Sequence, residues 1–411
     1  MNDVCNAPGL LPIETAIQNI LGTITPVKDV ETISIMQSVD RVLASDVKST
    51  INVPAHNNSA MDGYALCISD KSLTYTQVGS VFAGQVFEGT LTPGQCVRIM
   101  TGGAIAPGAN GVVMQENASV DGDKITFTAQ PELNENVRFA GEDIAIDDVI
   151  LKAGDKLKAV DVGLLASLGI ANIDVVRTLN IAVLSTGDEL IEPGQPLKQG
   201  AIFESNRAVI ISALQQKNID VLDLGIIPDD KELITNAFLK ANELADAVIS
   251  SGGVSVGEAD FTKEVLNEIG NIHFWKIAMK PGKPFAFGKL SNSYFFGLPG
   301  NPVSAAVTFN QLVEPALQKL SGLGDVNPKM RFNAVTTSVI KKRPGRADFQ
   351  RGTATINEQG DLVVAPFNKQ GSGVLSSLSK ANCLIVVPAQ SGNIEKGATV
   401  SIELLESIEV L

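Results

Sequence analysis

Apolar residues recur at helical spacing near the start of the chain. Residues 12–24 (PIETAIQNILGTI) place apolar side chains three and four positions apart, and Pro12 suits the first turn of a helix. Residues 156–170 (KLKAVDVGLLASLGI) return to the same period. Between these two stretches, short apolar runs alternate with turn signals such as the Pro-Gly pair at 93–94. The pattern predicts a β-rich module inserted into a more helical N-terminal domain.

From residue 178 the pattern changes to strands that alternate with helices. Five apolar runs predict strands, and these are TLNIAVLSTGDEL (178–190), IDVLDLGIIP (219–228), ADAVISS (245–251), IHFWKIAM (272–279) and SYFFGLPGNP (293–302). Helical stretches follow most of them, and the first of these stretches has Ser205 or Asn206 available as its cap. The alternation predicts a doubly wound α/β domain. The last part of the chain has short alternating strands and glycine-bearing turns, which are typical of a small β barrel or sandwich.

The fold class is therefore a multidomain α/β and β protein. A length of 411 residues is compatible with two to four domains, at roughly 100–200 residues each. The expected domains are a discontinuous N-terminal domain (1–50 and 143–177), an inserted β-rich domain (51–142), a central α/β domain (178–326) and a C-terminal β-barrel-like domain (327–411).

Composition and charge exclude several functions. A net charge of −13 argues against a general nucleic-acid binder, which needs a basic surface. We find neither a signal-peptide pattern nor an apolar run of the roughly 18–20 residues that a membrane span requires, so a cytoplasmic protein is expected. The four cysteines are widely spaced, which disfavours a zinc site. Only two histidines are present, neither beside a nucleophile motif, so Ser–His hydrolase chemistry is also disfavoured.

Polar and charged residues follow the predicted strands of the α/β domain. In such sheets ligands bind at the carboxyl ends of the strands, so this edge is the candidate site. The groups that follow the five strands in turn are Thr186 to Glu189, then Asp229 and Asp230, then the glycine loop 252–260, then Lys276, Lys280 and Lys283, and finally the loop 298–302.

The glycine loop has two interpretations. Gly252, Gly253 and Gly257 could simply form a tight turn, or their backbone N–H groups could bind an anion in a phosphate nest. Neither a Walker-type GxxxxGK[ST] motif nor GxGxxG occurs, which argues against the common nucleotide sites.

The acidic residues and lysines also have alternatives. Asp229 and Asp230 are placed where a carboxylate often only caps a helix. Glu189 and Asp260 lie in glycine loops and together would suit Mg²⁺ carried on a phosphorylated substrate. Lysines in an acidic chain are usually solvated surface residues, but the Lys280–Lys283 segment, which contains a Pro-Gly turn, lies at the same edge. Together these groups favour a site for a polyanion and a metal ion.

Eight motifs resemble those of the MoeA family of molybdopterin molybdenumtransferases, whose eukaryotic relative is the E domain of gephyrin. They span the chain in the family's order: NNSAMDGYA (57–65), RIMTGGA (98–104), RFAGEDI (138–144), STGDEL (185–190), SSGGVSVGEADFTK (250–263), KPGKPFAFGKL (280–290), GLPGNPVSA (297–305) and DFQRG (348–352).

The resemblance implies the last step of molybdenum cofactor synthesis and a central domain of the molybdopterin-binding type. It implies Mg²⁺-dependent insertion of molybdenum from molybdate into adenylylated molybdopterin, with release of AMP. Members are homodimers whose cleft is shared between the α/β domain of one subunit and the Met-Asp-Gly-Tyr region of the other. The resemblance also implies contact with the molybdopterin adenylyltransferase, and neither a nucleic-acid nor a membrane partner.

The resemblance also assigns residues to roles. The matching catalytic positions are Asp62, Thr101, Asp143, Glu189, Asp229, Asp260, Lys276 and Lys280, with Glu189 and Asp260 as metal ligands. The matching substrate-binding positions are Gly252, Gly253, Ser255, Gly257, Lys283, Pro299, Gly300, Asn301, Pro302, Ser304, Arg346, Arg351 and Ser372. Which of the two arginines contacts the oxyanion stays open.

Some points stay open beside the resemblance. Asn57 stands where many relatives have an aspartate, which could weaken a cation contact. Asp62 precedes a glycine and a tyrosine, a combination that often only makes a turn. Two alternative functions are adenylylation of molybdopterin, since the adenylyltransferase has a similar α/β domain, and a non-catalytic scaffold that uses the same fold.

Overall fold

The computed structural model describes residues 9–69, 71–82, 84–253, 261–326 and 328–405. The chain forms two compact units. The larger unit comprises the described residues of Met1–Glu31, Asp40–Ala44 and Asp174–Leu411, and the smaller unit comprises Thr32–Val39 and Ser45–Ile173. Two-stranded pairings link β1 (Val30–Ser34) with β12 (Asn172–Val176), and β14 (Leu190–Ile191) with β15 (Ile202–Phe203).

The larger unit is built on a six-stranded sheet in the order β16-β13-β17-β21-β20-β18. The strands are β13 (Asn180–Thr186), β16 (Asp220–Ile227), β17 (Ala247–Ser251), β18 (Asn271–Lys276), β20 (Pro284–Lys289) and β21 (Tyr294–Leu298). The first four strands of the spatial order are parallel, and β20 is antiparallel to both of its neighbours. Strand β18 therefore ends at the same edge as the parallel strands. The sequence pattern predicted five of these strands and did not single out β20.

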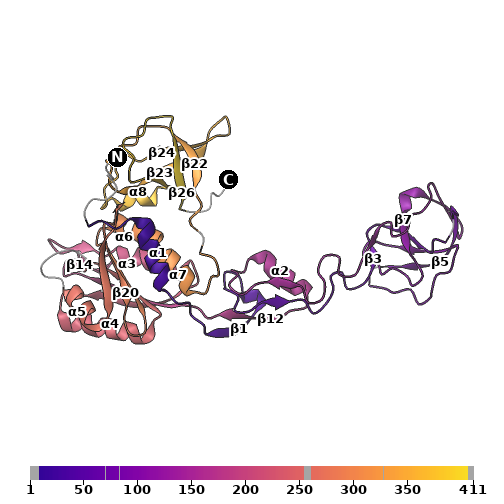
Figure 1. Ribbon diagram of the computed structural model, residues 1–411, viewed down its shortest axis with the longest axis horizontal. Helices are drawn as coiled ribbons and strands as arrows, with labels where there is room; N and C mark the ends of the chain where they lie inside the picture. Colours follow the sequence, from indigo (N-terminus) through magenta and orange to yellow (C-terminus); the bar gives the residue numbers. More distant parts are fainter. Residues whose placement is uncertain (1–8, 70, 83, 254–260, 327, 406–411) are drawn as a thin grey trace. The chain divides into compact units, whose positions relative to one another are not determined.

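Helices cover both faces of this sheet (Figure 1). One face carries α1 (Ile13–Thr23), α3 (Asn206–Gln215), α6 (Pro302–Thr308), the π-helical turn η3 (Phe309–Val313) and α7 (Glu314–Leu320). The other face carries α4 (Lys231–Leu244) and α5 (Phe261–Ile269). Alternate residues of β13 enter the two cores: Ile181 and Val183 face the first, and Ala182 and Leu184 face the second. A doubly wound α/β domain is thereby confirmed.

Helix α1 contributes to the core of the α/β sheet. Its residues Ile13, Ala16 and Ile20 are buried in the same cluster as Leu317 of α7. The predicted N-terminal domain thus gives its first helix to the larger unit, because the apolar face of α1 is covered there. The four-domain division itself stays a prediction.

The C-terminal part of the larger unit is a closed barrel. Its strands are β22 (Phe332–Thr336), β23 (Ala347–Ile356), β24 (Leu362–Pro366), β25 (Cys383–Val387) and β26 (Thr399–Leu404). The ring closes because β23 pairs with both β24 and β25. The short strand β19 (Met279–Lys280), which comes from the α/β domain, adds to β23, and α8 (Leu375–Ser379) follows β24. The predicted C-terminal barrel is confirmed.

The smaller unit contains the predicted β-rich module. Its main sheet has the order β7-β4-β6-β5-β9-β8. The strands are β4 (Gly63–Leu66), β5 (Thr74–Val81), β6 (Gln95–Ile99), β7 (Gly111–Met114), β8 (Ala118–Asp121) and β9 (Lys124–Phe127). The unit is completed by the pairs β3 (Asn58–Ser59) with β10 (Val137–Arg138) and β2 (Val47–Lys48) with β11 (Val149–Leu151), the turns η1 (Ile35–Gln37) and η2 (Gln115–Asn117), and α2 (Ala159–Ser167).

Helix α2 begins with a local hydrogen bond that its sequence provides. The carboxylate of Asp161 accepts a hydrogen bond of 2.7 Å from the backbone N–H of Lys158, which satisfies a donor at the helix start. Helix α2 lies within the stretch 156–170 that the sequence predicted to be helical.

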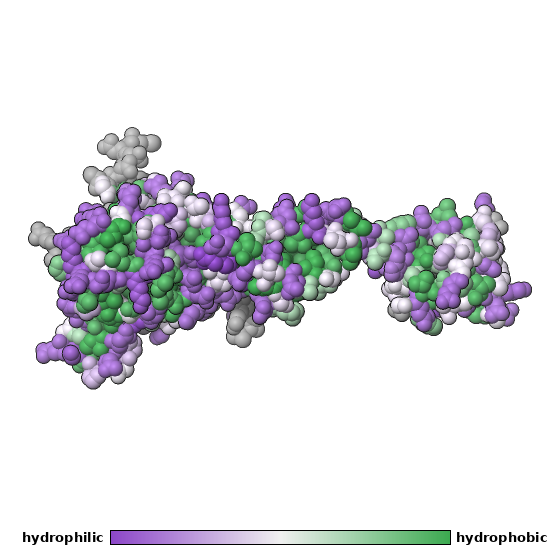
Figure 2. Space-filling model, turned by 90° about the horizontal axis from the view of Figure 1, so that it is seen from below, coloured by the Kyte–Doolittle hydropathy of each residue, from purple (hydrophilic) through white to green (hydrophobic). Residues whose placement is uncertain are grey.

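The surface of the chain is mixed in character. Figure 2 shows hydrophilic residues interspersed with apolar patches over the visible face. Among the helices of the described residues, none has the length and hydropathy needed to cross a bilayer.

We predict that Gly63 is required for the β-rich module. A Cβ atom added at Gly63 would lie 2.0 Å from the carbonyl oxygen of Val113, so G63A forces the backbone apart. The free energy of unfolding of G63A should be about 1–3 kcal/mol lower than that of the unaltered protein, as at other overpacked sites. The control is G22A, on an exposed position of α1 with open space around it, which should be neutral or stabilising. Urea unfolding measures both, and an unchanged midpoint for G63A would contradict the prediction.

Candidate functional site

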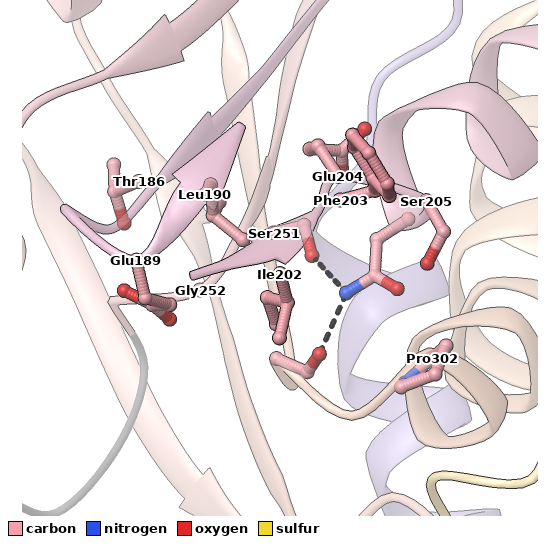
Figure 3. Close-up of a pocket in the computed structure, with 12 residues that line it drawn as sticks. Thr186, Glu189, Leu190, Ile202, Phe203, Glu204, Ser205, Ser251, Gly252 and Pro302 are labelled. Carbon is pink, nitrogen blue, oxygen red and sulfur yellow. Dashed lines mark hydrogen bonds between the residues drawn. The ribbon is translucent and has the colours of Figure 1, made fainter. Parts of the chain in front are cut away.

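The candidate site lies where the strand order reverses in the α/β sheet. The chain passes from β13 outward to β16 on one side, and then returns to β17 on the other side of β13. Ligands in open α/β sheets bind at such a switch point, outside the carboxyl ends of the strands. A pocket of about 110 Å³ lies here, at the ends of β13, β17 and β21 (Figure 3). Its lining residues are Thr186, Glu189, Leu190, Ile202, Phe203, Glu204, Ser205, Asn206, Ser251, Gly252, Gly300 and Pro302.

The sequence identified only part of this lining. Glu189, Gly252, Gly300 and Pro302 were predicted site residues, and the structure brings them together. The segment 202–206 was missed as a functional segment. Its signal in the sequence was the possible helix cap at Ser205 or Asn206, but no side-chain cap bond is present at Ser205.

Two glycines are required where the glycine loop leaves β17. Gly252 and Gly253 have φ angles of +89° and +65°, which L side chains rarely adopt. A Cβ atom on Gly252 would lie 2.6 Å from the carbonyl oxygen of Thr186, and one on Gly253 would lie 2.4 Å from the hydroxyl of Thr262. The loop therefore starts pressed against the end of β13 and against α5. Its predicted site residues Ser255, Gly257 and Asp260 lie outside the described residues.

Acidic side chains gather at the ends of β13 and β16. The carboxylate of Asp188 accepts a hydrogen bond of 3.0 Å from the backbone N–H of Asp229. Burial, followed by repulsion from Asp188 and Glu189, raises the pKa of Asp229 above its ordinary value. Asp230 has the simpler role, because its carboxylate caps α4 through the N–H of Leu233 at 2.9 Å. Within the described ranges, no three acidic, histidine or cysteine side chains form a metal-binding group.

The predicted lysines lie in and beside the hairpin that joins β18 to β20. Lys280 lies on β19, and its ammonium is 3.4 Å from the carboxylate of the buried Asp348 on β23. Lys342 is buried close by, and its burial, together with the charges of Lys280 and Arg346, lowers its pKa. We call Lys280, Lys342 and Arg346 the cationic cluster. Asp348 attracts both lysines of this cluster, and Arg346 acts on Lys342.

The remaining lysines and prolines have different surroundings. Lys276 and Lys283 are exposed, and the N–H of Ile277 donates to the carbonyl oxygen of Lys283 at 2.7 Å. Pro299 and Ser304 are buried, on either side of the exposed Gly300 and Asn301.

The side chain of Arg351 is buried and makes its hydrogen bonds within the C-terminal part of the chain. It is 1% exposed and donates hydrogen bonds to the hydroxyl of Ser377 and to the carbonyl oxygens of Lys369 and Gly371. Burial lowers the pKa of Arg351. The carbonyl oxygen of Ser372 in turn accepts a hydrogen bond of 3.0 Å from the N–H of Val303, at the start of α6. Arg351 thus shapes a loop that contacts the pocket side of the α/β domain, while Arg346 is the more accessible arginine.

The smaller unit pairs two of the predicted residues. The carboxylate of Asp62 accepts hydrogen bonds from the backbone N–H and the hydroxyl of Thr101, at 2.7 and 2.8 Å. These bonds, with a weaker contribution from Arg98, lower the pKa of Asp62. Asp62 therefore does more than terminate a turn, because it fixes the RIMTGGA segment beside β4.

Asp143 lines a separate cavity in the smaller unit. This cavity has a volume of about 440 Å³, and its lining residues are Val53, Pro54, Asn58, Arg138, Glu142 and Asp143. Asn57, where the family resemblance leads us to expect an aspartate, accepts a hydrogen bond of 2.9 Å from the N–H of Ala140. An amide oxygen serves this contact as a carboxylate oxygen would, so the local turn is kept.

Three family models match the chain in order. They are the "MoeA N-terminal region (domain I and II)" over residues 11–169, the "Probable molybdopterin binding domain" over 182–319 and the "MoeA C-terminal region (domain IV)" over 333–405. A molybdopterin molybdenumtransferase of Haemophilus influenzae is 47% identical over 397 residues, which cover 96% of this chain and 98% of that protein.

The chain belongs to the MoeA family. Gephyrin of Dictyostelium discoideum is 33% identical over 97% of this chain, which spans 63% of that protein. The crystal structure of a MoeA protein from Pyrococcus horikoshii aligns with a TM-score of 0.83 at 30% identity, over 96% of this chain and all of that one. The resemblance, the fold and the enzyme class of molybdopterin molybdenumtransferase are thereby confirmed.

We predict that Asp229 destabilises this MoeA protein when it is ionised. Because its pKa is raised in the folded state, the folded protein binds more protons than the unfolded chain, and stability falls as the pH rises through that range. D229N should therefore raise the free energy of unfolding at pH 7 more than at pH 4. D230N removes the same charge but keeps a capping side chain, so it should not stabilise. Urea unfolding at both pH values tests this, and equal effects of the two variants would refute it.

We also predict that the hydroxyl of Thr101 holds the pKa of Asp62 down. Removing that hydrogen bond in T101V should raise the pKa of Asp62 toward its ordinary value, whereas T101S should keep it low. Carboxyl-carbon NMR titration of the three proteins measures the effect. An unchanged pKa of Asp62 in T101V would show that the backbone N–H alone sets it.

Proposed function

We propose that this protein inserts molybdenum from molybdate into adenylylated molybdopterin, in a Mg²⁺-dependent reaction that releases AMP. Membership of the MoeA family supports molybdenum cofactor synthesis. The single observation that carries the finer proposal is the pocket at the switch point, where the glycine loop, the acidic residues and the loop 298–302 meet at one sheet edge.

The size of the pocket supports a partial substrate site. A cavity of about 110 Å³ is well below the roughly 300–1,000 Å³ typical of complete small-molecule sites. Adenylylated molybdopterin is far larger than this space. The pocket therefore receives one group of the substrate, and the exposed Ile202 and Phe203 at its rim offer apolar contact to a flat ring.

The cationic cluster supports the handling of oxyanions. Molybdate and phosphate groups are bound most strongly by charged donors, and Lys280 and Arg346 are positively charged and accessible. Lys342 cannot take this part, because its ammonium already donates to the carbonyl oxygens of Arg343, Ala389 and Ser391. Lys280 and Arg346 are therefore the residues that we assign to molybdate.

Glu189 is the magnesium ligand that we propose on the described part of this edge, because a carboxylate oxygen is the kind of ligand that Mg²⁺ prefers. Burial, and then repulsion from Asp188 and Glu189, raises the pKa of Asp229, and a cation bound at Glu189 would relieve part of that repulsion. A Cβ atom at Gly187 would lie 2.5 Å from a carboxylate oxygen of Glu189, so this glycine gives the Glu189 side chain its room. Asp260 remains the proposed second ligand beside Glu189. When bound, Mg²⁺ neutralises charge on the phosphate groups of the substrate.

The family resemblance extends the proposal to partners and location. It supports a homodimer, transfer of the substrate from the molybdopterin adenylyltransferase and a cytoplasmic location. It also supports roles in the reaction for Asp62, Thr101 and Asp143, two of which are linked by the hydrogen bonds described above.

The reaction itself tests the proposal. Purified protein is incubated with adenylylated molybdopterin, molybdate and Mg²⁺, and AMP and molybdenum cofactor are measured. We expect AMP release that requires molybdate and that stops when Mg²⁺ is removed with a chelator. Consumption of ATP with plain molybdopterin would instead indicate an adenylyltransferase. Absence of both reactions would favour a scaffold.

We predict that Lys280 sets the requirement for molybdate. Loss of its charge in K280Q should raise the molybdate concentration for half-maximal activity by about ten-fold, which equals about 1.4 kcal/mol and is typical of one charge-assisted hydrogen bond. The control is K240Q, on an exposed position of α4, which should change nothing. An unchanged molybdate dependence in K280Q, with folding confirmed by urea unfolding, would remove Lys280 from the oxyanion site.

A further inference from the structure

One buried side chain connects three strand ends around the pocket. Asn206 is the first residue of α3, which follows β15, and it is 8% exposed. Its amide nitrogen donates to the hydroxyl of Ser251, the last residue of β17, and to the carbonyl oxygen of Gly300, just after β21; both distances are 2.8 Å (Figure 3). A side-chain amide has two N–H groups, so both are used.

We propose that Asn206 is a positioning residue for molybdenum transfer, which holds Ser251 and Gly300 where the substrate-binding loops must begin. The proposal concerns a residue for which the sequence pattern indicated at most a helix cap and the resemblance gave no role. It rests on the hydrogen bonds, the burial and the pocket described above, and on the transferase activity of the family.

The main chain on both sides of Asn206 is held firmly. The carboxylate of Glu204, which is 4% exposed, accepts hydrogen bonds from the hydroxyl of Ser185 and the N–H of Arg207, at 3.0 and 2.7 Å. The guanidinium of Arg207 pairs with Asp223 on β16 and with Glu192. Asn206 is therefore fixed to the sheet before its own side chain makes any contact.

The loop that Asn206 holds has few other constraints. Gly300 is exposed, and open space surrounds the position of a Cβ atom on it. In the described part of the chain, the bond from Asn206 is the hydrogen bond that fixes the Gly300 carbonyl. The next fixed points are the carbonyl oxygen of Asn301, which accepts a hydrogen bond of 2.9 Å from the N–H of Ala305, and the N–H of Val303, which donates to the carbonyl oxygen of Ser372. Without Asn206, the carbonyl of Gly300 would lose this hydrogen bond, and Gly300 could shift at the mouth of the pocket.

Asn206 is held firmly by the sheet, whereas Gly300 has few other contacts, so Asn206 sets the position of Gly300. Misplacement of a reacting group by about 1 Å can lower a rate by about 100-fold. The amide is also neutral, so it fixes the loop without adding charge to a pocket that already contains Glu189. A lysine in its place would attract the carboxylate, and an aspartate would repel both Glu189 and the Gly300 carbonyl.

The test compares variants that remove the amide donors. N206A deletes the side chain, and N206D keeps its size but replaces the nitrogen with an oxygen. Each should raise KM for the molybdopterin substrate and lower kcat, with a combined loss of about 100-fold in kcat/KM. S251A, which removes one of the two acceptors, should have a smaller effect in the same direction. Formation of molybdenum cofactor, measured by activation of a molybdenum enzyme that lacks it, gives both constants.

The control is another asparagine of the same domain. Asn242 on α4 donates to the hydroxyl of Ser291 and accepts from the N–H groups of Asn292 and Ser293, but at the turn that precedes β21, which is the opposite sheet edge. N242A should lower the urea midpoint about as much as N206A does and leave KM and kcat unchanged.

The outcomes separate a positioning role from a structural one. Wild-type KM in N206A and N206D, with activity reduced only in proportion to the unfolded fraction, would overturn the proposal, as would an equal loss in N242A. If N206A does not fold, N206D and S251A decide the question by the same two constants. Inactivity of the unaltered protein would count against the proposed function instead.

Discussion

The ends of β13 and β17 approach each other so closely that a Cβ atom does not fit between them. The carbonyl oxygen of Thr186 would lie 2.6 Å from a Cβ on Gly252, and the next glycine is pressed equally closely against Thr262. Parallel strands bring their carboxyl ends to one edge, but this contact brings the loops themselves together. The pocket, the acidic residues and the Asn206 bonds all depend on this approach, because each of them joins groups from neighbouring strand ends.

The second arrangement that matters is the junction between the α/β domain and the barrel. Phe349 and Val386 of the barrel are buried in the same core as Phe285 and Leu298 of the sheet. Arg351 contributes indirectly, since it shapes the loop whose Ser372 contacts α6. The substrate edge is therefore supported from both sides by packed structure.

Much of this was predictable from the sequence, and the parts that were not have physical reasons. The strand ends and their polar residues could be predicted because most apolar runs stop at glycines or acidic residues. Strand β20 was not predicted because it begins at Pro284, shortly after the Pro281-Gly282 turn. The pattern showed an apolar face on helix 12–24 but not which core covers it, and the structure places Ile13 and Ile20 against the α/β sheet. Asn206 could be recognised only as a possible cap, because the sequence does not tell where a side chain points. The roles predicted for Ser255, Gly257 and Asp260 stay predictions.

The pairing of β19 with β23 has a consequence for shortened forms of the enzyme. Lys280 lies opposite Asp348 in the parallel pairing of these strands, and its ammonium is 3.4 Å from the carboxylate of the same residue. A polypeptide that stops after α7 would retain every strand of the α/β sheet yet lose the edge against which this lysine is aligned. Lys280 belongs to the α/β domain, but its position depends on the C-terminal barrel. A shortened protein must therefore include the barrel if Lys280 is to keep the position that it has in the full chain.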